Sequence, residues 1–108
     1  MNPIRSCIKG VLELIASKEK QIKYEQFVPI ADVPAELICM WFDDNYHPDS
    51  WQCKQAFSAK EQQILGSFND YYNSRCDKLP KSLVKLHADR LWSEIMLEAK
   101  KTKEAIKW

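Results

Sequence analysis

Near the start of the chain, apolar residues recur at three-, four- and seven-residue steps, the period of an amphipathic helix. This stripe consists of Ile4, Ile8, Val11, Ile15 and Ile22. Asn2 and Pro3 precede it, and these residue types are favoured at the N-cap and at the first helical position. We therefore predict a helix that begins at Pro3 and has Ile22 on its apolar face. Gly10 lies within it, and we expect this glycine to allow a close helix crossing.

The pattern is less regular over residues 23–33, where Pro29 would interrupt a helix or a central strand. We predict an irregular connector here that lays its aromatic side chains on the core. A second helix follows, with Val33 as its cap and Pro34 in its first turn. It ends before Pro48, since a residue that precedes proline is disfavoured in helical geometry. Its apolar face consists of Leu37, Ile38, Trp41 and Phe42.

A third helix has the clearest start signal, because Ser58 and Glu61 form a capping box. Residues 45–57, which precede it, are predicted to be a long irregular loop. Ser82 is the predicted cap of a fourth helix, with a possible break near His87. The apolar stripe of this last helix consists of Val84, Ala88, Leu91, Ile95, Ala99, Thr102 and Ile106.

These patterns together predict an all-α protein. Only two glycines occur among 108 residues, and strand-like alternation is scarce. The 45% hydrophobic and 29% charged content is that of an ordinary globular domain. We predict a single helical domain over residues 1–108, with about four helices and an irregular, aromatic-rich connector.

The sequence shows no apolar run long enough to span a membrane and no secretory signal. We therefore expect a cytoplasmic protein without a membrane partner. The four cysteines, Cys7, Cys39, Cys53 and Cys76, are widely spaced. In that compartment we expect them to be buried free thiols rather than disulfides.

Charge is distributed unevenly along the chain, although the net charge is only +1. Residues 1–31 carry a net charge of +2, residues 32–70 carry −5, and residues 71–108 carry +4. A segment of one sign attracts a partner of the opposite sign. The middle of the chain is therefore predicted to attract a basic partner.

Within the acidic middle, Asp43 and Asp44 fall at the end of the second predicted helix, where negative charge opposes the helix dipole. Acids and aromatics together are typical of a protein-binding surface. The candidate partner-binding residues are Asp43, Asp44, Tyr46, His47, Asp49, Trp51 and Asp70. A second interpretation is equally open, in which Asp44 or Asn45 caps a turn and the aromatics fold inward.

Other chemistry has little support in the sequence. No spacing of cysteine and histidine matches a zinc motif, and no glycine-rich phosphate loop is present. His47 with Cys53, or His87 with Cys76, could form a thiol–imidazole pair, but such pairs arise readily by chance. We expect no catalytic residues, no metal, no cofactor and no small-molecule substrate.

The basic end of the chain supports an alternative, a small helical protein that is regulatory or associated with nucleic acid. Its contact residues would be Lys100, Lys101, Lys103, Lys107 and Trp108. Alternating glutamates and a pI of 7.6 instead favour a solvated helix face. Nucleic acid is therefore the less favoured partner.

The middle of the chain resembles a group of small bacterial immunity proteins from toxin–immunity loci, including contact-dependent growth inhibition systems. The resemblance covers about residues 34–99. The residues that carry it are Glu36, Leu37, Ile38, Trp41, Phe42, Asp43, Asp44, Tyr46, Pro48, Phe57, Ser58, Glu61, Leu65, Phe68, Trp92 and Ala99.

What the resemblance implies is a non-enzymatic inhibitor that binds one cognate toxin and blocks its active site. Toxins of such systems are often nucleases with basic substrate clefts, which an acidic inhibitor surface would complement. The expected partner is therefore a basic toxin domain.

Overall fold

The computed structural model describes residues 2–108, and all regular elements in that part of the chain are helices. The prediction of an all-α protein is confirmed. Seven α-helices, one π-helix and one short 3-10 helix stand in place of the four expected helices. In chain order they are α1 (Pro3–Ala16), α2 (Lys18–Phe27), α3 (Val33–Cys39), η1 (Met40–Asn45), α4 (Trp51–Ala56), α5 (Ala59–Asn73), η2 (Cys76–Lys78), α6 (Leu83–His87) and α7 (Arg90–Ala105).

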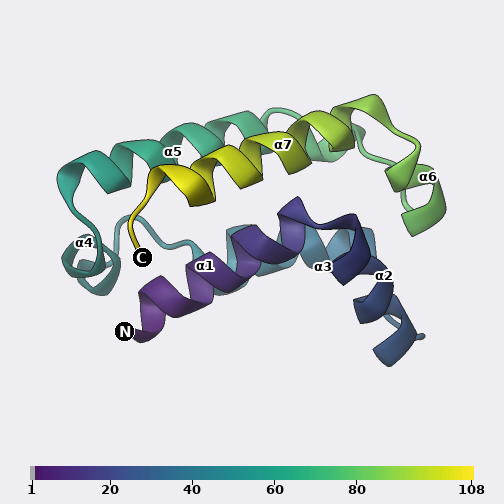
Figure 1. Cartoon of the computed structure of the whole chain (residues 1–108), viewed down its shortest axis with the longest axis horizontal. Coiled ribbons are helices and arrows are strands. Elements are labelled where there is room, and N and C mark those ends of the chain that lie inside the picture. Colours follow the sequence, from purple (N-terminus) through teal and green to yellow (C-terminus); the bar gives the residue numbers. More distant parts are fainter. Residues whose placement is uncertain (1) are drawn as a thin grey trace.

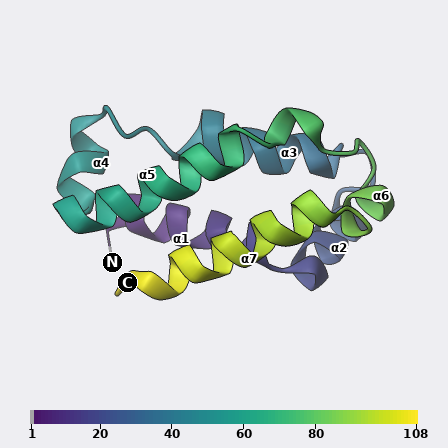
Figure 2. The ribbon, with the colours of Figure 1, turned by 90° about the horizontal axis from the view of Figure 1, so that it is seen from above.

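The three long helices α1, α5 and α7 form the body of the molecule, which measures 37 × 25 × 22 Å. Figure 1 shows α5 and α7 side by side, with α1 beneath α7. Figure 2 shows α7 along one long edge, while α3 lies along the opposite edge. The core fills the space between these helices, because each turns its apolar stripe inward. Its fully buried side chains include Ile8, Leu12, Ile15, Leu37, Trp41, Leu65, Tyr72, Leu86, Trp92 and Ile95.

Trp41 is the aromatic centre of this core. Its ring stacks on Tyr46 with centroids 4.7 Å apart and meets Phe68 edge-on at 4.9 Å. Its indole N–H donates a hydrogen bond to Asn69 Oδ1 at 3.1 Å. This aromatic cluster fixes the end of η1 against α5, as expected for large side chains in favourable edge and stacked geometries.

The first helix ends sooner than predicted, at a break centred on Ser17. Ser17 is extended, ends α1, and accepts a hydrogen bond at its Oγ from the backbone N–H of Lys20, which caps α2. The fully buried Gln21 takes the core position, while Ile22 is 38% exposed. The prediction that Ile22 continues the apolar face is therefore wrong, because the break rotates the chain.

The segment over residues 23–33 also differs from the prediction, since α2 continues to Phe27 and only residues 28–32 are irregular. Phe27 is 86% exposed and Ile30 is 96% exposed, so these side chains project outward, whereas the half-buried Tyr24 packs against the core as predicted. The next helix begins one residue earlier than expected. Asp32 is its cap, with its carboxylate accepting from the Ala35 N–H, and Val33 is the first helical residue.

Two further elements refine the predicted order. The expected loop over residues 45–57 contains the short helix α4, capped by Ser50, whose Oγ accepts from the Cys53 N–H at 3.2 Å. The capping box of Ser58 and Glu61 at the start of α5 is confirmed. The break near His87 is also present and separates α6 from α7, and Val84 is 82% exposed on α6 instead of continuing the buried stripe.

Across residues 2–108, no helix has the length and apolar character needed to cross a membrane.

Candidate functional site

The second half of the α3–η1 segment departs from α-helical geometry. The N–H of Tyr46 donates to the carbonyl oxygen of Trp41, five residues back, at 3.0 Å. That bond defines a π-turn, a geometry that occurs often at functional sites. Asn45 Nδ2 donates to the Met40 carbonyl oxygen at 2.8 Å and so satisfies a further acceptor of the last turn. Asn45 therefore caps the turn, as one of the two interpretations anticipated.

The structure corrects the prediction made for Tyr46. It is only 7% exposed and stacks on Trp41, so its ring faces the core and is not on the partner-binding surface where it was predicted. Burial raises the pKa of its hydroxyl, with smaller contributions from Cys53, Asp70 and Asp49. The carboxylates of Asp49, from the loop, and Asp70, from α5, thus lie near enough to the Tyr46 hydroxyl to affect its pKa.

The remaining predicted residues are exposed, as a contact surface requires. We define the acidic face as Asp43, Asp44, Asp49 and Asp70. The ion pairs within 4 Å among residues 2–108 use other carboxylates, those of Glu13, Glu19, Glu61, Glu94 and Glu98. The acidic face is therefore free of internal ion pairs in this part of the chain.

Trp51 and His47 flank this face. The indole of Trp51 is 64% exposed at the first position of α4, and His47 is exposed in the preceding loop. The His47 carbonyl oxygen accepts hydrogen bonds from the Ser50 N–H at 3.1 Å and from Ser50 Oγ at 2.8 Å. The loop that carries both side chains is thus held by the same serine that caps α4.

Glu36, which was not among the predicted partner-binding residues, lines a hollow together with Asp44 and Cys39. Its carboxylate accepts a hydrogen bond from the Tyr24 hydroxyl of α2. Loss of hydration raises the pKa of the exposed Cys39 thiol, and the carboxylates of Asp43, Asp44 and Glu36 raise it further. The spacing of Glu36, Asp43 and Asp44, seven and eight residues along one helical path, was a signal that could have grouped them.

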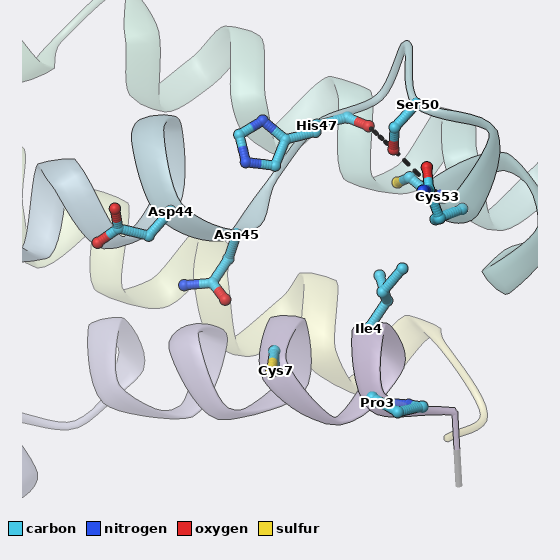
Figure 3. Close-up of a pocket in the computed structure, with 9 residues that line it drawn as sticks. Pro3, Ile4, Cys7, Asp44, Asn45, His47, Ser50 and Cys53 are labelled. Atoms are coloured by element: carbon cyan, nitrogen blue, oxygen red, sulfur yellow. Dashed lines mark hydrogen bonds between the residues drawn. The ribbon is translucent and has the colours of Figure 1, made fainter.

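A cavity of about 450 Å³ opens between the start of α1, the end of η1 and the start of α4 (Figure 3). The N-terminal helix was not assigned to the site by sequence, yet it forms one wall. Asn45 points toward α1 across this cavity, while the carboxylate of Asp44 is directed to the side, at the left of the view. Its lining residues are Pro3, Ile4, Cys7, Asp44, Asn45, His47, Ser50, Gln52 and Cys53.

The two thiol–imidazole pairs considered from sequence are not formed. Figure 3 shows the His47 ring directed away from Cys53. His87 Nε2 instead lies 2.8 Å from Gln21 Oε1, and the Cys76 thiol donates to the Asn73 carbonyl oxygen at 3.5 Å. Among the described residues, no group of three or more histidine, cysteine or acidic side chains is placed to hold a metal ion.

The cysteines are free thiols, as predicted. They are not all buried, however. Cys7 and Cys39 are exposed, Cys76 is intermediate and only Cys53 is buried, where burial raises the pKa of its thiol. The expectation of buried thiols is wrong for Cys7 and Cys39, because both lie outside the apolar stripes of their helices.

The basic alternative site is only partly available. Trp108 packs edge-on against Phe57 with ring centroids 6.0 Å apart, and its indole N–H donates to the Lys103 carbonyl oxygen at 2.9 Å. The Arg5 guanidinium also lies 5.5 Å from the Trp108 ring. A ring engaged in this way is a poor stacking platform for a base. Lys101 pairs with Glu98 at 3.7 Å.

In comparisons with protein-family models, curated proteins and solved structures, this chain has no match. The resemblance to immunity proteins therefore stays a prediction that depends on the residues named above.

Proposed function

We propose that this protein is a non-enzymatic inhibitor that binds a basic protein partner through the acidic face. The observation that carries the proposal is the set of four exposed carboxylates without internal ion pairs, next to an indole that is 64% exposed. Tryptophan is among the residue types that contribute most to binding energy at protein interfaces. Unpaired carboxylates speed association with a basic surface and select it over neutral ones.

Folding stability does not account for these acids. Asp43 and Asp44 lie near the C-terminal end of η1, where a negative charge opposes the partial negative charge of the helix end. Each is expected to destabilise the fold by roughly 0.3–1 kcal/mol. A binding role would explain why this cost is present.

The partner that fits best is a cognate toxin domain of a bacterial toxin–immunity locus of the contact-dependent growth inhibition type. A nuclease is favoured, because its cleft must be basic to hold the phosphate backbone. The inhibitor would cover that cleft and act in the cytoplasm, where the toxin reaches its substrate. This identity rests on the sequence resemblance, whereas the choice of surface rests on the exposed, unpaired acids.

The test is charge reversal on the acidic face. The binding partner to use is the C-terminal domain of any toxin gene that lies directly upstream. The Asp43→Lys/Asp44→Lys variant should bind it at least about a hundredfold more weakly, since close charge pairs contribute several kcal/mol. A matched control, Glu25→Lys/Glu104→Lys, reverses two exposed carboxylates elsewhere and should bind like the parent. Circular dichroism should show both variants folded. Equal affinity of the two variants for the toxin domain would refute the proposed surface.

A further inference from the structure

A second hollow, of about 510 Å³, lies where α1 passes into α2, against α7. It shares no residue with the acidic face or with the cavity between α1, η1 and α4, and it includes Lys100 and Lys103 of the alternative basic site. We call it the lysine groove. Its lining residues are Glu13, Ala16, Ser17, Lys18, Lys20, Met96, Lys100 and Lys103.

The lysine groove is positively charged, with four ammonium groups and one carboxylate on its walls. Glu13 Oε2 is shared between Lys20 Nζ at 4.0 Å and Lys103 Nζ at 3.8 Å, so one carboxylate serves two lysines at the limit of ion-pair distance. Among residues 2–108, neither Lys18 nor Lys100 has a carboxylate within 4.0 Å. The groove therefore keeps an excess of positive charge.

The helix dipole accounts for the presence of lysine on only one wall of the groove, the wall formed by α7. Lys103 lies in the last turn of α7, where a positive charge is favourable. Lys18 and Lys20 stand in the first turn of α2, where a positive charge opposes the helix dipole. Local stability thus disfavours lysine at these two positions, which is the pattern expected if they serve a ligand.

The geometry of the groove is fixed by the fold. The fully buried Gln21 donates from Nε2 to the carbonyl oxygens of Leu14 and Ile15, both at 2.9 Å, and so sets the angle between α1 and α2. Lys18 and Lys20 are therefore held on one wall, while Lys100 and Lys103 extend from α7 on the other. An anion placed between the walls meets lysines on both sides.

We propose that the lysine groove binds a small ligand with several linked phosphate groups, which spans from Lys18 and Lys20 to Lys100. Lysine ammonium groups are common phosphate ligands and act there as point charges. A single phosphate can neutralise one wall, whereas a chain of phosphates can engage both at once. The ligand would lie on the opposite long edge from α3, because Figure 2 places α7 and the start of α2 on that edge.

The experiment titrates the whole chain with inorganic tripolyphosphate and with orthophosphate at low ionic strength, followed by isothermal calorimetry. Tripolyphosphate should bind at least about tenfold more tightly than orthophosphate, because each added charge-assisted contact contributes at least that factor. The Lys18→Gln/Lys100→Gln variant should lose about tenfold or more in tripolyphosphate affinity.

The matched control is Lys54→Gln/Lys60→Gln, which removes two exposed lysines outside the groove and gives the same net charge. It should change tripolyphosphate affinity by no more than about twofold, an effect of net charge alone. The proposal is overturned by absence of tripolyphosphate binding, or by equal losses in the two variants. It is also overturned if a short oligonucleotide binds through Lys18 and Lys100 while tripolyphosphate does not. None of these outcomes depends on the toxin partner. Phosphate binding by the lysine groove and partner binding by the acidic face are therefore tested independently.

Discussion

The guanidinium of Arg5 and the carboxylate of Glu61 form a two-point contact, with Nη1–Oε1 at 2.9 Å and Nη2–Oε2 at 3.2 Å. The same guanidinium donates to the carbonyl oxygens of Ala56 at 2.8 Å and Lys107 at 2.6 Å. One side chain of α1 thereby joins the end of α4, the start of α5 and the segment after α7. Glu61 also completes the capping box of α5.

We expect Arg5→Met to lower the free energy of unfolding by about 2 kcal/mol at neutral pH, because it removes charge-assisted hydrogen bonds and leaves carbonyl groups unpaired. Urea denaturation measures the change. Glu98→Gln is the comparison, since it breaks a surface pair with Lys101 and should cost less than about 1 kcal/mol. Similar losses in both variants would contradict the special role of Arg5.

This contact also predicts a pH dependence. The Arg5 hydrogen bonds hold the pKa of Glu61 below its ordinary value of 4.5. A carboxyl group with a lowered pKa in the folded state stabilises the protein above 4.5, and this contribution is lost as the pH falls below that value. The stability difference between the parent and Arg5→Met should therefore shrink on acidification below pH 4.5. A difference that stays constant down to acidic pH would contradict the assignment.

Gln21 is the buried polar residue on which the α1–α2 break depends. Its Oε1 accepts the Trp92 indole N–H at 3.2 Å and lies 2.8 Å from His87 Nε2. Gln21→Leu keeps the side-chain size but leaves both donors and the carbonyl groups of Leu14 and Ile15 without a hydrogen-bond partner. The free energy of unfolding should therefore fall by about 3 kcal/mol. Gln63→Leu, at an exposed position of α5, should change stability by less than about 0.5 kcal/mol in the same assay.

Tyr72 presents the opposite case, a buried hydroxyl without a hydrogen-bond partner among the described residues. Its ring packs among those of Phe42, Phe68 and Trp92. Tyr72→Phe removes an unsatisfied polar atom, and we expect stability to stay the same or to rise by about 1 kcal/mol. Tyr24→Phe loses a hydrogen bond to Glu36 and should lower stability instead. A marked loss on Tyr72→Phe in thermal unfolding would disprove this expectation.

Gly10 was expected to allow a close helix crossing, and the structure shows open space around it. A Cβ atom built at Gly10 would have no neighbour within 4 Å. Gly10→Ala should therefore raise stability by about 1 kcal/mol through helix propensity alone. A loss of stability in chemical denaturation would mean that another surface approaches Gly10 closely.

Substitution of Trp51 should affect partner binding without affecting folding stability. Since its side chain is 64% exposed, Trp51→Ala should change stability by less than about 0.5 kcal/mol but weaken toxin binding by about thirtyfold or more. Trp41→Ala affects the fully buried ring and should cost about 3–5 kcal/mol of stability. Unfolding curves and binding titrations on the two variants distinguish these effects, and unchanged binding by Trp51→Ala would remove Trp51 from the interface.

Local signals in the sequence predicted the elements whose ends are set by one or two neighbouring residues. Asn2, Ser58 and Ser82 each cap a helix where a cap was expected. Their effect is local, because a side-chain oxygen satisfies a backbone N–H two or three residues away. Such signals need no knowledge of the rest of the fold.

Features that depend on distant contacts could not be predicted in the same way. The seven-residue step from Ile15 to Ile22 continues across the break at Ser17, and only the contacts of Gln21 with α7 reveal which side chain turns inward. Tyr46 is preceded and followed by polar residues, yet its ring is buried because it stacks on Trp41. The short helix α4 has too few residues to show a period, although Ser50 was a usable cap signal.

The π-turn at Met40–Asn45 also has an evolutionary consequence. It accommodates one more residue than an α-helical turn would, between the buried Trp41 and the buried Tyr46. Loss of one residue here would restore the ordinary repeat and swing the following side chains by about 100° around the helix axis. If the acidic face binds a partner as proposed, a single-codon deletion here would re-aim its carboxylates, with the core sequence of α1, α5 and α7 left intact.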